Sequence, residues 1–322
     1  MNIEKIKEHI GDVLVETNFP NLGEKKVGKV RDIYTAKDHI TLISTDRHSS
    51  FDRTIAYIPF KGEVLNQISL FWFEKTRDII QNHVISMPDP NTAIVKKCKV
   101  IPIEMVVRGY ITGSTNTSLW TLYKNGERDF GSFVLEEGIK KNQKLDKPVL
   151  TPTTKSDEHD RPITPKELVA EGIINKELWD EMASKAILLF KRGQDIALEH
   201  DLILVDTKYE FGIDENGILT LIDEIHTPDS SRYWQKKTYK ERIDGGFEPD
   251  NFDKEFLRLW FKENCDPYTD VVLPKAPAEM VAELSRRYIQ IYEQITDRPF
   301  NHDFSIPTIR RINNNLSKLT TN

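Results

Sequence analysis

Cysteine, net positive charge and long apolar runs are all scarce in this chain, and each absence excludes a class of protein. The 322 residues include only two cysteines, Cys98 and Cys265, which are far apart and match no metal-binding spacing. This excludes a disulfide framework and is typical of a reducing compartment. The net charge of −6 argues against broad nucleic-acid binding. No run approaches the ~20 apolar residues of a membrane span, and no apolar signal core follows Met1, so we expect a cytoplasmic protein.

The length predicts about two domains, and the apolar pattern predicts a mixture of strands and helices. Thr164, Pro165 and Glu167 form a capping box that begins a short helix ending near Gly172. Residues 136–163 show little apolar periodicity, so we expect a linker there. The other predicted elements are strands within 24–60, at 93–96, at 105–107 and from 202, a helical patch over 117–123, and helices over 66–82, 176–200, 254–263 and 277–296.

One glycine-containing segment has most of a phosphate-binding P-loop but lacks its essential residue. Residues 23–29 fit Gly-x4-Gly-Lys, yet Val30 stands where a metal-binding Ser or Thr is required, and the segment opens a strand. We therefore reject the P-loop. Lys29 and Arg31, two apart in a predicted strand, would share one face, and Gly28 would let the backbone approach a ligand. The alternatives are a phosphate clamp and an edge strand protected by charge.

Acidic residues occupy the strand that begins at Leu202, where apolar residues would be expected. Asp206, Lys208 and Glu210 alternate and so share one face. The Asn-Gly pair at 216–217 predicts a hairpin: a two-residue turn sets Glu210 opposite Asp223, and a four-residue loop sets Lys208 opposite Asp223. In both registers Asp223 faces the same way as Glu210. Two facing carboxylates repel, and Mg²⁺ would reverse that sign. The alternative is a solvated outer face.

Two further patches place an arginine among hydroxyls or glycines. Arg108 lies within 104–114 and Arg232 within 227–234. A guanidinium recognises carboxylate or phosphate through its planar fork. Together with Lys29 and Arg31 beside the acidic hairpin, these patches favour a metal–phosphate site.

These motifs, taken in order, resemble those of the SAICAR synthetase family, in its longer, yeast-like form. The resemblance covers about residues 24–250. The matching segments are Gly-Lys-Val-Arg-Asp-Ile-Tyr at 28–34, Asp-Arg-His-Ser-Ser-Phe-Asp at 46–52, Glu-Met-Val-Val-Arg-Gly-Tyr-Ile-Thr-Gly-Ser at 104–114, Asp-Thr-Lys-Tyr-Glu-Phe-Gly at 206–212 and Asp-Glu-Ile-His-Thr-Pro-Asp-Ser-Ser-Arg at 223–232. The resemblance implies an α+β fold with an ATP cleft between two domains, similar to protein kinases and ATP-grasp enzymes. We expect the domains at 1–103 and 104–322.

The resemblance also implies an activity and a set of roles. The activity is an ATP- and Mg²⁺-dependent ligation of CAIR, a carboxylated imidazole ribonucleotide, to L-aspartate. The implied roles are ATP binding for Gly28, Lys29, Arg31 and Glu104, substrate binding for Ser49, Arg108, Ser114, Asp229 and Arg232, Mg²⁺ binding for Glu210 and Asp223, and a place beside the reacting groups for Lys208. Asp46 and Asp206 are candidates for the base that deprotonates the amine, the alternative being that each orders a loop. A small-molecule kinase and a nucleotide-binding regulatory module remain as alternative functions.

Overall fold

The computed structural model describes residues 1–322 except 116, 156–160, 253–254 and 320–322. The chain forms two compact units. The first unit comprises Met1–Phe73, His83–Lys97 and Phe252–Asn322, and the second comprises Glu74–Asn82 and Cys98–Asn251. The predicted α+β class is confirmed, because helices and sheets occur in both units. No helix in the described ranges is long and apolar enough to cross a membrane.

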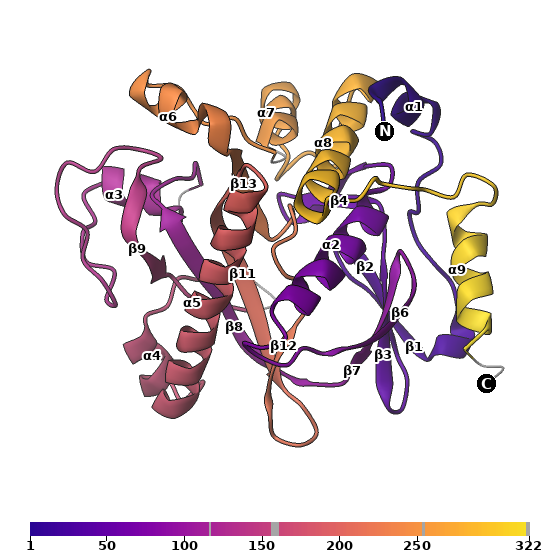
Figure 1. Ribbon diagram of the computed structural model, residues 1–322, viewed down its shortest axis with the longest axis horizontal. Helices are drawn as coiled ribbons and strands as arrows, with labels where there is room; N and C mark the ends of the chain where they lie inside the picture. Colours follow the sequence, from indigo (N-terminus) through magenta and orange to yellow (C-terminus); the bar gives the residue numbers. More distant parts are fainter. Residues whose placement is uncertain (116, 156–160, 253–254, 320–322) are drawn as a thin grey trace. The chain divides into compact units, whose positions relative to one another are not determined.

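The first unit is built on a five-stranded antiparallel sheet with the order β1-β2-β3-β7-β6. Its strands are β1 (Glu24–Val27), β2 (Arg31–Thr35), β3 (His39–Ser44), β6 (Val84–Asp89) and β7 (Thr92–Lys96), and a separate hairpin joins β4 (Arg47–Ser50) to β5 (Arg53–Tyr57). The helices are α1 (Ile3–Glu8), η1 (Pro20–Leu22), α2 (Lys61–Lys75), α7 (Glu255–Asn264), α8 (Ala278–Thr296) and α9 (Thr308–Ser317). Figure 1 labels α1, α2, α7, α8 and α9.

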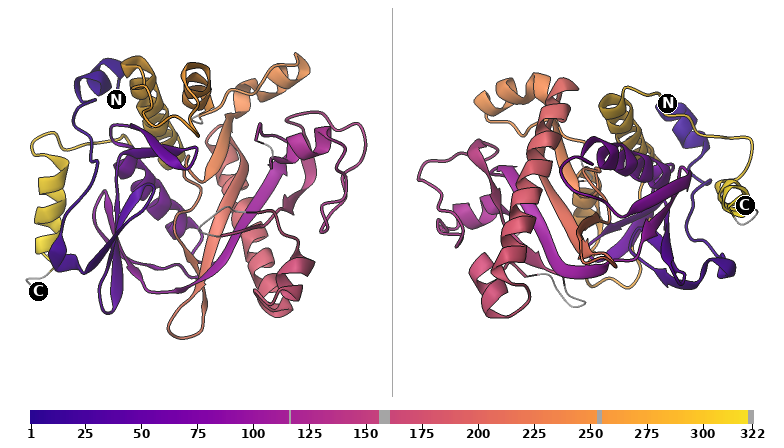
Figure 2. Two further views of the ribbon diagram at one scale, coloured as in Figure 1. Left: turned by 180° about the vertical axis from the view of Figure 1, so that it is seen from behind. Right: turned by 60° about the horizontal axis from the view of Figure 1, so that its bottom comes forward.

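The second unit is built on two long antiparallel strands, β8 (Lys99–Tyr110) and β11 (Leu202–Ile213). Its other strands are β9 (Lys144–Leu150), β10 (Thr153–Thr154), β12 (Leu219–Ile222) and β13 (Ser231–Gln235), and its helices are α3 (Leu119–Lys124), α4 (Pro165–Ala170), α5 (Lys176–Glu199) and α6 (Lys236–Asp244). Helix α5 packs on β8 and β11, as both views of Figure 2 show. Gly193 lies on the buried side of α5 and is required there, because a Cβ would lie 2.4 Å from the His226 ring.

The C-terminal residues group differently from the expected division at 103 and 104. The chain passes from one unit to the other at Lys97–Cys98, and residues 252–322 belong to the first unit. The reason is apolar burial: Ile312 and Leu316 of α9 pack with Tyr34 and Ile43 of the sheet. A sequence pattern shows that a helix has an apolar stripe, but it does not show which sheet covers that stripe.

Several local predictions are confirmed, and others need correction. The capping box of Thr164 and Glu167 is present, and the helix over 176–200 occurs as α5. The expected linker over 136–163 contains the edge strand β9 and the short β10, with 156–160 outside the described residues. Helix α2 begins at Lys61 and ends at Lys75, earlier than the expected 66–82, and its first turn buries charged residues that apolar periodicity does not detect. Helices α6 and α9 were not predicted.

Candidate active site

The centre of the second unit's sheet places two glutamates face to face. Glu104 on β8 is the direct register partner of Glu210 on β11. Facing carboxylates destabilise a sheet, and a lysine between them removes the conflict. The Lys208 Nζ donates to Glu104 Oε1 at 2.7 Å and to Glu210 Oε1 at 3.0 Å. Lys155, which follows β10, donates to the other oxygen of Glu210. We call these four residues the open cluster.

The hairpin register differs from both expected registers. Glu210 pairs with Ile222, and the loop between the strands has five residues, 214–218. Asp214 builds this loop, because its Oδ1 accepts the backbone N–H groups of Asn216 and Ile218 at 3.0 Å each. Continued alternation beyond β12 would set Asp223 opposite Tyr209, on the other face from Glu210.

The backbone at Asp223 interrupts that alternation. Its φ is 66°, a left-handed conformation that non-glycine residues rarely adopt outside functional or tightly constrained sites. Its charge nevertheless acts on Lys208. Burial alone would lower the pKa of Lys208, but the negative charges of Glu210, Asp223 and Glu104 outweigh burial and raise that pKa above its ordinary value. Lys208 therefore carries a positive charge. The charges of Asp223 and Glu210 both stabilise it, although neither expected hairpin register was correct.

A second charged group is centred on Asp206, which lies two residues before Lys208 in β11. This residue pairs in register with Arg108 on β8 and with Arg232 on β13. Its Oδ2 lies 2.9 Å from Arg232 Nη1 and 3.7 Å from Arg108 Nη1. Arg108 is also fixed by a 2.8 Å hydrogen bond from its Nε to Thr151 Oγ1. One carboxylate thus sets the spacing and direction of two guanidinium groups.

The loop over 223–232 is held by a buried histidine. His226 Nε2 lies 2.5 Å from the Tyr209 hydroxyl, and the Tyr233 hydroxyl donates to the His226 carbonyl oxygen at 2.7 Å. Burial lowers the pKa of His226 to about 3, so the ring is neutral. The Asp229 backbone N–H donates to Thr227 Oγ1 at 3.3 Å. The loop that contains Asp223 and Asp229 is therefore anchored to β11.

Ser114 follows a glycine that lets its loop approach Arg232. Gly113 has φ of 108°, and a Cβ there would lie 2.4 Å from the Ser118 Cβ and 3.4 Å from Arg232 Nη1. A side chain at 113 would displace the loop from the arginine. The second unit thus brings together the expected substrate residues Arg108, Arg232 and Ser114.

In the first unit, the expected phosphate residues lie at a turn rather than along one strand. The strand pairing of β1 with β2 ends at Val27, and the Gly28 N–H donates to the Arg31 carbonyl oxygen at 2.8 Å. Lys29 and Val30 form the turn, so the expected strand alternation of Lys29 with Arg31 is wrong. Lys29 Nζ lies 2.6 Å from Asp52 Oδ1 with both side chains exposed, and such a pair contributes little stability. A phosphate can displace Asp52 at small cost.

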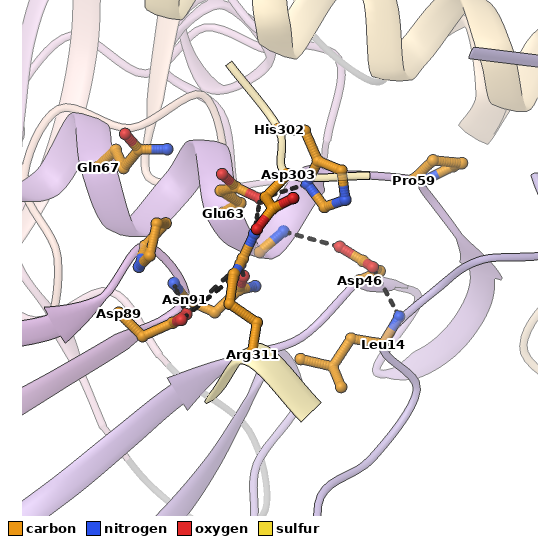
Figure 3. A network of polar contacts seen from close by, with 12 residues as sticks. Leu14, Asp46, Pro59, Glu63, Gln67, Asp89, Asn91, His302, Asp303 and Arg311 are labelled. Atoms are coloured by element: carbon orange, nitrogen blue, oxygen red, sulfur yellow. Dashed lines mark hydrogen bonds and ion pairs between the residues drawn. The ribbon is translucent and has the colours of Figure 1, made fainter. Parts of the chain in front are cut away.

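Asp46 and Ser49 belong to the β4–β5 hairpin of the same unit. Asp46 is buried and accepts the backbone N–H groups of Leu14 at 2.7 Å and Gly62 at 2.9 Å. Figure 3 shows the contact with Leu14. Burial raises the pKa of Asp46 to about 6, although these two hydrogen bonds oppose the shift. Ser49 is half-buried and pairs in register with Thr54. These contacts match the loop-ordering alternative for Asp46.

Sequence reasoning missed three residues that shape these sites. Lys155 reaches Glu210 and Thr151 reaches Arg108, both from the segment expected to be a linker. The signal was its run of hydroxyl and basic residues at 153–156. Arg47 donates to the Gly28 carbonyl oxygen at 3.0 Å and to Asp32 Oδ1 at 2.8 Å, which fixes the turn at Lys29 and Val30. The motif 46–52 contained Arg47 without revealing its partner.

Comparison with known proteins gives the family. Residues 24–275 match the family model described as SAICAR synthetase. A phosphoribosylaminoimidazole-succinocarboxamide synthase of Legionella pneumophila (strain Paris) is 56% identical over 95% of this chain and 98% of its own length. The chloroplastic enzyme of that name from Arabidopsis thaliana is 54% identical over 98% of this chain and 77% of its own.

Solved structures agree with the sequence comparisons. The SAICAR synthase of Saccharomyces cerevisiae complexed with SAICAR has a TM-score of 0.76 at 31% identity, covering 90% of this chain and all of that one. A SAICAR synthetase in complex with ADP has a TM-score of 0.66 at 26% identity, covering 87% of this chain and all of that one. This chain belongs to the SAICAR synthetase family.

Proposed function

We propose that this chain joins CAIR to L-aspartate through an amide bond, with ATP converted to ADP and phosphate, in de novo purine biosynthesis. The observation that supports this best is the open cluster beside Asp206 and its two arginines. A fixed cation among carboxylates and a pair of guanidiniums suit a reaction in which every reactant is an anion. Family membership supplies the substrates that the geometry alone does not specify.

The chemistry requires that a carboxylate be made into an acyl donor. A carboxylate oxygen of CAIR attacks the γ-phosphorus of ATP, and ADP leaves with the electron pair of the broken P–O bond. The neutral amine of aspartate then attacks the acyl carbon. Phosphate leaves with one oxygen that was in the carboxylate, and the amine loses a proton. Fixed cations lower both barriers because they are already oriented toward the oxygens on which charge develops.

Within this scheme Lys208 stabilises the transferring phosphoryl group. Its pKa is raised, so it remains charged throughout and acts electrostatically rather than as a base. Arg108, Arg232 and Ser114 bind the carboxylate and phosphate of CAIR, and Asp229 orders the loop beside them. Asp206 orients the two guanidiniums, a role that its ion pairs support over that of a general base. Ser49, from the first unit, contacts CAIR.

ATP is bound through the turn over residues 28–31 and through Glu104. The turn requires glycine at Gly28, since a Cβ there would lie 2.9 Å from the Arg31 carbonyl oxygen, and the missing side chain lets a phosphate approach. Lys29 and Arg31 supply charge, and Glu104 accepts from the ribose hydroxyls. Asp46 is shielded from ligands by burial and orders the hairpin that carries Ser49.

Glu210 and Asp223 fit Mg²⁺ through the chemistry of their donors. Across the described residues, no group of three or more histidine, cysteine or acidic side chains could hold a metal ion. Mg²⁺ usually takes one or two carboxylates and completes its octahedron with phosphate oxygens and water, so two acids suffice when ATP is present. When bound, Mg²⁺ neutralises charge on the β- and γ-phosphates. In this structure the Glu210 carboxylate contacts two lysines, Lys155 and Lys208.

The test is whether ATP consumption depends on aspartate. Purified protein with ATP, Mg²⁺ and CAIR should release ADP in a one-to-one ratio with succinocarboxamide, and only when aspartate is added. A small-molecule kinase would release ADP equally without aspartate and form no amide. A regulatory module would bind ATP without turnover. Either outcome would overturn the proposal.

A further inference from the structure

The C-terminal segment that lies beyond the family match is part of the first unit's interior. The match ends at residue 275, whereas α8 and α9 begin at Ala278 and Thr308. These helices bury apolar residues and also introduce one buried cation, Arg311, whose side chain is only 8% exposed. A buried guanidinium is expensive unless it is fully paired, so its partners indicate what it fixes.

Arg311 joins three elements of the first unit. Its Nη1 lies 3.2 Å from Glu63 Oε2 in α2, its Nε lies 3.1 Å from Asp89 Oδ2 at the end of β6, and its Nη2 donates to Asn91 Oδ1 at 2.5 Å. His302, from the loop before α9, adds a 2.7 Å contact from Nδ1 to the same Glu63 oxygen. Figure 3 shows these side chains converging. We call Glu63, Asp89 and Arg311 the sealed cluster.

The sealed cluster is adjacent in sequence to a residue that binds Asp46. Gly62 precedes Glu63 and donates its N–H to Asp46 Oδ1. Gly62 is also packed tightly, because a Cβ there would lie 2.3 Å from the Ser44 carbonyl oxygen. The first turn of α2 therefore cannot shift without moving Asp46.

Helix α8 holds the same turn from another direction. Ser285 Oγ donates to the Pro59 carbonyl oxygen at 2.7 Å, and Lys61 Nζ lies 5.9 Å from the centre of the Tyr288 ring. The Ile58 N–H closes the base of the β4–β5 hairpin by donating to the Asp46 carbonyl oxygen at 2.8 Å, and the Lys61 N–H joins α2 to that base by donating to the Ile58 carbonyl oxygen at 3.2 Å. The C-terminal segment thus contacts the chain at the base of the hairpin that carries Ser49.

We infer that Arg311 and Glu63 are positioning residues for Ser49, acting through the first turn of α2 and Asp46. This inference rests on the proposed function, in which Ser49 contacts CAIR. A purely stabilising role would not need this chemistry, because apolar residues of similar volume often replace buried ion pairs without loss of stability. The Arg311 guanidinium contacts two carboxylates and the Asn91 amide. These hydrogen bonds fix the orientation of the first turn of α2, which apolar packing alone would not fix.

The experiment is a double-mutant cycle between Arg311 and Ser49, read out as the dissociation constant for CAIR by titration calorimetry. Arg311→Met and Ser49→Ala should each weaken CAIR binding about tenfold, the loss of one hydrogen bond to a charged group. The double variant should be no weaker than either single variant, because both changes remove the same contact. Multiplicative losses would overturn the inference.

A second variant and a matched control separate positioning from stability. Glu63→Gln keeps the shape and one acceptor, so it should fold even if Arg311→Met does not, and it should show the same non-additivity with Ser49→Ala. Ile312→Ala removes a buried neighbour of Arg311 in α9 without touching Glu63. It should lower the free energy of unfolding and leave the dissociation constant for CAIR unchanged within twofold, because Ile312 shares no contact with Ser49 and such sites act independently. Equal weakening by Ile312→Ala would overturn the inference.

Assays of the wild-type protein separate failure of the positioning inference from failure of the proposed function. If it forms succinocarboxamide but the cycle is additive, the positioning inference fails and the proposed function stands. If it binds no CAIR and forms no amide, the proposed function fails first.

Discussion

The sealed cluster and the open cluster solve the same electrostatic problem in different ways. Each sets carboxylates close together and neutralises them with cations. In the sealed cluster the acids are at most 2% exposed and the cation is one arginine. In the open cluster the cations are two lysines, Lys208 and Lys155, whose side chains are 31% and 42% exposed.

The difference shows what each cluster can do. A guanidinium offers a rigid fork and stays paired, so it fixes geometry. An ammonium is a compact charge on a flexible stem, and a half-exposed lysine can leave one carboxylate for a phosphate at modest cost. Burial and the type of cation therefore separate a cluster that fixes the fold from one that accommodates ligands.

The largest effect should follow from removing charge at the two proposed metal ligands, Glu210 of the open cluster and Asp223. Glu210→Gln and Asp223→Asn should each lower Mg²⁺-dependent turnover by about 10³-fold or more, because phosphoryl transfer depends on the metal's charge. Steady-state rates across a Mg²⁺ titration measure this, with circular dichroism to show an intact fold. Glu215→Gln, in the exposed loop of the same hairpin, should leave the rate unchanged. Wild-type rates in both site variants would remove the metal assignment.

A matched pair of lost cations should separate the clusters by stability. Arg311→Met removes the guanidinium that pairs with two buried carboxylates, Glu63 and Asp89, and should cost about 3–5 kcal/mol of unfolding free energy. Lys155→Met removes a partly exposed partner and should cost below about 1 kcal/mol. Urea unfolding of both variants gives the comparison. Similar losses in the two variants would contradict the distinction drawn from burial.

Beside the sealed cluster, Asp46 should make stability depend on pH. Its folded pKa of about 6 lies above the ordinary aspartate value of 3.8, so the folded state binds the proton more tightly than the unfolded chain does. This contribution is fully present below about pH 4, falls as pH rises through about 6, and is worth on the order of 3 kcal/mol for two pKa units.

The measurement is the difference in unfolding free energy between wild type and Asp46→Asn from pH 4 to 7. The wild type should lose stability relative to Asp46→Asn across that window. A constant difference would show that the Asp46 pKa is ordinary and that the carboxylate is not held as the structure indicates.

The smallest effect should come from a conservative change at a guanidinium near the open cluster. Arg108→Lys should raise the KM for CAIR about tenfold through the loss of the planar fork, with the KM for ATP unchanged. Lys191→Arg, on the surface of α5, is the control and should alter neither constant. Equal effects on both substrates would contradict the assignment of Arg108 to CAIR.

The sequence predicted the elements with strong periodicity and the identity of the site residues, but not how they meet. Helix α5 and the capping box of α4 follow from local patterns. The hairpin register was wrong because Asp214 builds a longer loop by side-chain hydrogen bonds that no turn motif announces. The direct partner of Glu210 is Glu104, more than a hundred residues away, and strand order is not readable from spacing.

Two other failures have the same origin in tertiary contacts. Lys155 was not predicted as a site residue, because it lies in the expected linker over 136–163. One lysine among hydroxyl residues indicates no function until its partner, Glu210, is known. Helix α9 was missed although its buried side includes Arg311, because a charged residue in a stripe reads as exposed until an acid is found to pair with it.

The central claim is that the CAIR carboxylate is activated by phosphoryl transfer and then captured by aspartate. The most direct test uses CAIR labelled with ¹⁸O in both carboxylate oxygens and follows the label by mass spectrometry of the released phosphate. We predict one ¹⁸O in each phosphate, released only with aspartate present and accompanied by one ¹⁸O in the new amide. Phosphate free of ¹⁸O would contradict the account.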